Sequence, residues 1–82
     1  MSSDKSIQWQ IELLAAAYEI ELARLEGKKG YEHNKANRKR HDRVGFLGRM
    51  LARKYGGKVV ETLKENGREK AQEHFDRYNP RK

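Results

Sequence analysis

The chain has 82 residues, of which 35% are hydrophobic and 38% are charged, and it contains no cysteine. A chain of this length buries little more than ~60% of the surface that its unfolded form exposes, so its hydrophobic core is small. The lack of cysteine excludes disulfide bonds and thiolate metal sites, and the composition leaves little from which to build a sheet. We therefore expect one all-α domain over residues 1–82, a small bundle of three helices, with frayed ends at about 1–3 and 79–82.

The formal net charge of +7 is concentrated in one part of the sequence. Residues 35–54 hold eight basic side chains and one acidic side chain, whereas the charges of the two flanking segments cancel. No apolar run approaches the ~20 residues of a membrane span, and the N-terminal sequence lacks the pattern of a secretory signal. We expect a cytoplasmic protein with an anionic partner and no contact with membranes.

The first predicted helix covers residues 4–25, with Ser2, Ser3 or Asp4 as its N-cap and residues 27–30 as its end. It carries two apolar stripes on roughly opposite faces. One stripe consists of Ile7, Ile11, Leu14, Tyr18, Leu22 and Leu25. The shorter stripe consists of Trp9, Leu13, Ala16, Ala17 and Ile20. Because one neighbouring helix cannot cover both, we expect this helix to be central, or to form a homodimer interface through Trp9, Leu13 and Ile20.

The second predicted helix covers residues 31–55 and ends at Gly56-Gly57, where the conformational freedom of glycine suits a left-handed C-terminal cap. Its first half is polar and basic nearly all round. Its second half offers six side chains for burial, which are Val44, Phe46, Leu47, Met50, Leu51 and Tyr55. Gly45 and Gly48 in this half indicate either close helix packing or a bend.

The third predicted helix begins near residue 58. Its apolar positions share one face only if the helix continues through Gly67, which we expect; a break there would give four helices. Four glutamates at steps of four form an acidic ridge on this helix, namely Glu61, Glu65, Glu69 and Glu73. If this acidic ridge docks on the basic helix, part of the positive charge serves the fold and less of it is left for a partner.

The basic side chains of the second helix are the candidate binding site. Five of them share a broad face, namely Lys35, Arg38, Lys39, Arg49 and Arg53. The other three, Arg40, Arg43 and Lys54, spread round the side of the helix. Such a helix can lie along a phosphate backbone, and Asn34 and Asn37 would reach base edges. The competing interpretation is an ordinary solvated face.

Sequence patterns of catalysis and metal binding are missing. His33 and His41 are eight residues apart, whereas a chelating pair on a helix has a spacing of four. We found no nucleophile with a plausible base and no phosphate-binding glycine loop, so we expect neither an enzyme nor a metal, cofactor or small-molecule substrate. Residues 51–56 resemble the turn of a helix-turn-helix, but Thr62 and Glu65 occupy positions where that motif buries apolar side chains.

These observations predict a small nucleic-acid-binding or regulatory protein that contacts the phosphates of DNA or RNA through residues 35–54. The alternative is a protein-interaction module or inhibitor that docks the same basic helix on an acidic surface of a larger enzyme or nucleoprotein complex.

Overall fold

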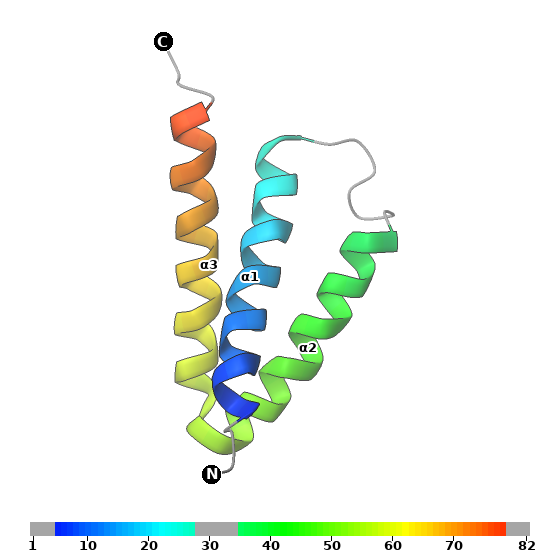
Figure 1. Cartoon of the computed structure of the whole chain (residues 1–82), viewed down its shortest axis with the longest axis vertical. Helices are drawn as coiled ribbons and strands as arrows, with labels where there is room; N and C mark the ends of the chain where they lie inside the picture. The colour runs from blue at the N-terminus through cyan, green and yellow to red at the C-terminus, as the bar shows by residue number, and fades with distance from the viewer. Residues whose placement is uncertain (1–4, 28–34, 79–82) are drawn as a thin grey trace.

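A computed structural model describes residues 5–27 and 35–78, which form three α-helices. They are α1 (Lys5–Leu25), α2 (Lys35–Tyr55) and α3 (Gly57–Tyr78). In Figure 1, α1 and α3 run in the same direction, and α2 runs in the opposite direction. The expected all-α bundle is confirmed for the described residues. In the same part of the chain, no helix has the length and apolar character needed to cross a membrane.

The core lies where all three helices approach one another. It consists of Leu13 of α1, Leu47 and Leu51 of α2, and Val60 of α3, none of which is more than 6% exposed. Trp9, Val44, Ala52 and Leu63 pack against this cluster. Since α1 contacts both α2 and α3, its predicted central position is confirmed.

The structure buries the shorter apolar stripe of α1 more deeply than the longer one. Leu13 is 0% exposed within a single chain, so the prediction that it forms a dimer interface is wrong. The other two proposed interface residues are also partly covered: Trp9 packs against the core, and Ile20 is half-buried. The exposed apolar side chains belong to the longer stripe, in which Ile7 is 60% and Ile11 59% exposed. Periodicity located both stripes, but it does not say which one faces the neighbouring helices.

The C-terminal ends of α1 and α2 are each followed by a glycine in the left-handed conformation. Gly27 follows α1 with a φ of 64°, and Gly56 follows α2 with a φ of 94°, so both predicted stops are confirmed. The Gly56 N–H donates to the Ala52 carbonyl at 2.8 Å. Gly56 alone separates α2 from α3, which excludes the turn of three to four residues typical of a helix-turn-helix.

Several sequence predictions lie outside the described residues. These are the N-cap at residues 2–4, the loop glycine at 30, the helical start at 31–34 and the frayed tail at 79–82. The described part of α2 therefore begins at Lys35.

Gly67 explains how α3 passes α1 at close range. The helix is continuous through this residue, as expected. A Cβ atom at Gly67 would lie 2.6 Å from the Leu14 carbonyl oxygen and 3.0 Å from the Cβ of Ala17, so the backbones approach closely only because the side chain is missing. At Gly45 and Gly48, which were expected to have this role or to bend α2, a Cβ would make only ordinary contacts, at 3.6 and 3.5 Å.

Candidate functional site

Helix α2 is oriented by its buried apolar side chains. Leu47 and Leu51 are 1% and 0% exposed and stand one helical step of four apart. Because they turn one face of the helix toward the core, the opposite face is turned to solvent. Figure 1 shows that α2 lies near the other helices at its Tyr55 end and diverges from α1 toward its Lys35 end.

Long polar side chains connect α1 with the diverging half of α2. Arg40 donates through Nε to the Glu19 carboxylate at 3.2 Å and through Nη1 to the Asn37 amide oxygen at 2.7 Å. Arg43 forms an ion pair with Glu12. These two arginines, both predicted as binding residues, therefore hold α2 against α1.

Asn37 does not have the role expected of it. Its side chain is only 5% exposed and accepts the hydrogen bond from Arg40, so it cannot reach the edge of a base. Asn34, the other asparagine considered for that role, lies outside the described residues. Its position on the helix gives the reason: Asn37 lies on the same side of α2 as Val44, seven residues later, and faces α1.

Five predicted binding residues remain on the outward face of α2. Lys35, Arg38, Lys39, Arg49 and Arg53 are exposed, and within residues 5–27 and 35–78 none of them forms an ion pair. We call this set the outward cations. The eighth predicted residue, Lys54, is exposed at the end of the helix with its Nζ 5.7 Å from the centre of the Tyr55 ring.

Four of the outward cations lie on one straight stripe of the helix surface, which also contains a carboxylate and an aromatic ring. At successive steps of four, three, four, three and four, the stripe consists of Lys35, Lys39, Asp42, Phe46, Arg49 and Arg53. At 1.5 Å per residue it extends over about 27 Å. Phe46 was expected to be buried, but it is 50% exposed. Its helical register with the lysines and arginines was visible in the sequence and would have predicted this exposure.

The acidic ridge of α3 makes ion pairs within its own helix. Glu61 pairs with Lys64, and Glu65 with Arg68, each at 3.3 Å. All four glutamates of the ridge are exposed. The ion pairs described between α2 and another helix go instead to α1. The alternative in which the ridge neutralises the outward cations therefore finds no support in the described contacts.

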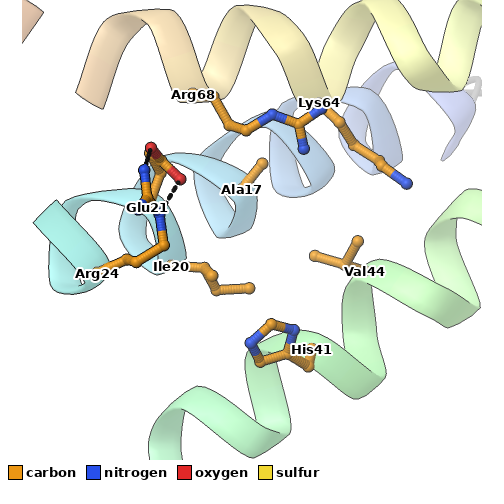
Figure 2. Close-up of a pocket in the computed structure, with 8 residues that line it drawn as sticks. All are labelled: Ala17, Ile20, Glu21, Arg24, His41, Val44, Lys64 and Arg68. Carbon is orange, nitrogen blue, oxygen red and sulfur yellow. Dashed lines mark hydrogen bonds and ion pairs between the residues drawn. The ribbon is translucent and has the colours of Figure 1, made fainter. Parts of the chain in front are cut away.

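A cleft of about 270 Å³ lies between the three helices (Figure 2). Ile20 and Val44 point toward one another at its apolar side, and Arg24, Lys64 and Arg68 lie at its edge. All three cations have carboxylate partners, so their charge is compensated locally. This cleft is therefore a weaker candidate for an anion site than the outward face of α2.

The pKa of Glu21, which lines this cleft, is shifted by its surroundings. The Glu21 carboxylate accepts hydrogen bonds from Arg24 at 2.5 and 3.0 Å (Figure 2). These bonds, aided by the charges of Arg24 and Arg68, lower the pKa of Glu21, while its partial burial acts in the opposite direction.

The two described histidines lie in different surroundings. His41 is exposed and lies on the wall of the cleft in Figure 2. His74 packs between Tyr18 and Tyr78, with ring centroids 6.1 and 4.7 Å away. Within the described residues, no three His, Asp or Glu side chains are grouped as metal ligands would be.

The outward face of α2 is thus the candidate site that combines exposure, uncompensated charge and a regular arrangement. Comparison with protein-family models, with curated protein sequences and with solved structures found no match to the chain.

Proposed function

We propose that the protein binds nucleic acid and that the outward face of α2 contacts the phosphate backbone. The observation that carries this proposal is the division of the α2 cations into two sets. Arg40 and Arg43 are engaged with α1, whereas the five outward cations have no ion partner within the described residues. Like charges four residues apart on a helix repel each other, as in the pair Lys35 and Lys39, and an anionic partner removes that cost.

A polyphosphate fits this face because of its length and charge. The stripe runs about 27 Å along one side of a helix, so several phosphates of one strand can be contacted at once. Each Lys or Arg that contacts a phosphate releases a counterion. The salt slope of log K therefore changes by about 0.9 per contact for duplex DNA and about 0.7 for a single strand.

The test is a salt titration of binding to labelled DNA and RNA, using two variants of equal charge. The first replaces Lys35, Lys39, Arg49 and Arg53 by Gln. The control replaces four exposed cations elsewhere by Gln, namely Lys5, Lys58, Lys70 and Arg77. Both variants lose four positive charges, so a difference between them reports the position of the charges and not their number.

We expect wild-type affinity to fall steeply between ~50 and ~200 mM salt. The α2 variant should bind at least tenfold more weakly than wild type, with a salt slope reduced by about 3 to 4. The control variant should keep most of the wild-type affinity and most of the wild-type salt slope. Equal losses in the two variants would overturn the assignment to α2. Absence of wild-type binding at low salt would overturn the function itself and would favour an acidic protein surface as the partner of this helix.

A further inference from the structure

The aromatic side chain at the middle of the stripe sets this surface apart from a simple cationic one. Phe46 is 50% exposed, and it is not among the side chains that pack against the core. Lys35 and Lys39 lie on the stripe before it, and Arg49 and Arg53 lie after it. A single exposed apolar side chain is common on protein surfaces, but a ring with cations before and after it on one stripe combines the two features by which proteins hold single strands, a cationic track and an aromatic face for stacking.

The cation nearest to Phe46 on the stripe is Arg49, and its side chain bends back toward the helical turn that contains Phe46. The Nη1 atom of Arg49 lies 3.6 Å from the position that a Cβ on Gly45 would occupy, next to Phe46 in the sequence. A guanidinium group and an aromatic ring therefore belong to the same turn of the helix. That pair of groups serves a phosphate and an adjoining base.

The one carboxylate of the stripe lies one turn on the other side of Phe46. Asp42 is exposed, and no ion pair involving it is found in residues 5–27 and 35–78. A continuous row of duplex phosphates along the stripe would pass over this negative charge. The exocyclic amino group of an unpaired base, in contrast, can donate a hydrogen bond to a carboxylate.

We infer that the outward face of α2 binds unpaired nucleic acid in preference to duplex, with one base stacked on the Phe46 ring; this rests on the proposed function. The cations at both ends of the stripe hold the phosphates, and the middle of the stripe receives the base. In a duplex the faces of the bases are stacked against one another and are not accessible to this ring. The ring therefore adds affinity only for a strand whose bases can turn outward.

The test compares an unstructured single strand of about 20 nucleotides, longer than the usual site of a single-strand binding module, with the duplex of the same sequence. Three variants are measured with the full chain at one salt concentration: Phe46→Ala, Phe46→Leu and Phe46→Trp. Leu keeps the apolar volume but has no ring, so it separates stacking from simple hydrophobic contact. Since the Phe46 side chain is half exposed, all three should fold, which thermal melts followed by circular dichroism verify.

We expect wild type to prefer the single strand, and both Phe46→Ala and Phe46→Leu to weaken that binding about tenfold. Their duplex affinity should stay within about twofold of wild type, and Phe46→Trp should bind the single strand at least as tightly as wild type. In a Trp9→Phe background, the indole introduced by Phe46→Trp should lose fluorescence when the single strand binds, because the base stacks on it.

The stacking of a base on Phe46 would be overturned if Phe46→Leu kept the wild-type affinity for the single strand. It would also be overturned if the Phe46 variants lost equal affinity for the single strand and for the duplex. Either result leaves phosphate binding by the outward cations standing. Failure of wild type to bind either probe at low salt would remove the proposed function together with this inference, so the two failures are distinguishable.

Discussion

At the scale of single residues, Gly67 is the position where the fold depends most directly on the absence of a side chain. Its Cα lies so close to α1 that an added Cβ would be 2.6 Å from the Leu14 carbonyl oxygen and 3.1 Å from the Tyr18 nitrogen. Both are backbone atoms and cannot move aside without displacing the helix. The sequence indicated Gly67 only as a place where α3 could break, because helix propensity says nothing about a neighbouring backbone.

We predict that Gly67→Ala destabilises the protein by about 1–3 kcal/mol, since the overpacking outweighs the better helix propensity of alanine. Gly45→Ala is the matched control. There the nearest contact is the flexible end of Arg49 at 3.6 Å, so alanine should leave stability unchanged or raise it by up to about 1 kcal/mol. Urea unfolding followed by circular dichroism measures both, and equal effects of the two substitutions would contradict the close approach of α3 to α1.

The lowered pKa of Glu21 predicts that the stability of the protein depends on pH. The pKa of this carboxylate is lowered from the usual 4.5, mainly by the hydrogen bonds from Arg24. As the pH falls, the unfolded chain therefore takes up this proton before the folded chain does. The stabilising contribution of Glu21 is fully present above pH 4.5, and it is lost as the pH falls through the lower pKa of the folded state.

We expect Glu21→Gln to be less stable than wild type at pH 7, and we expect this difference to shrink as the wild-type carboxylate becomes protonated in acid. Urea unfolding of both proteins at neutral pH and at steps below pH 4.5 measures the difference. If the difference in unfolding free energy between wild type and Glu21→Gln stayed constant across this pH range, Arg24 would not stabilise the ionised form of Glu21.

At the scale of the helices, α2 consists of two halves that are held in different ways. Leu47 and Leu51 anchor the second half in the core. Arg40 and Arg43 connect the first half to α1, and Asn37 accepts a hydrogen bond from Arg40. The sequence predicted these halves from the position of the apolar side chains. It could not assign Arg40 and Arg43 to the fold, because their partners Glu19 and Glu12 are far away in the sequence.

Asn37→Ala should therefore loosen the first half of α2 in particular. Its amide oxygen holds Arg40 in position, and loss of a buried hydrogen-bonding group costs about 1–2 kcal/mol. Amide hydrogen exchange should become faster near Arg40, while the amides near Leu51 keep their protection because the core is unchanged. Lys39→Ala, an exposed change in the same half, serves as the control; uniform acceleration along α2 would contradict the independence of the halves.

At the scale of the whole molecule, a small core is enough to hold together three helices that carry a highly charged surface. The buried leucines lie near the α2–α3 junction, where the hydrogen bond of 2.6 Å between Ser6 and Tyr55 also joins α1 to α2. The all-α class, the helix order and the basic face were predictable because periodicity and charge are local properties of the sequence. The choice of the buried stripe on α1 was not predictable in this way, because it depends on how the helices face one another.

The proposed function predicts that nucleic acid stabilises the folded protein, because folding aligns the outward cations. The unfolded chain has the same net charge but not this arrangement, so it should bind more weakly. A single-stranded oligonucleotide at about 100 times its Kd should then raise the free energy of unfolding by up to ~2.7 kcal/mol, which for a domain of this size shifts Tm by roughly 10–20 °C.

Thermal melts with and without the oligonucleotide measure this shift, and the variant lacking Lys35, Lys39, Arg49 and Arg53 should lose most of it. The control variant with four cations removed elsewhere has the same net charge, and it should keep the shift. If wild type binds the strand but its Tm does not rise, the folded and unfolded chains bind equally well. Affinity would then come from net charge alone, and the alignment of cations on α2 would have no part in it.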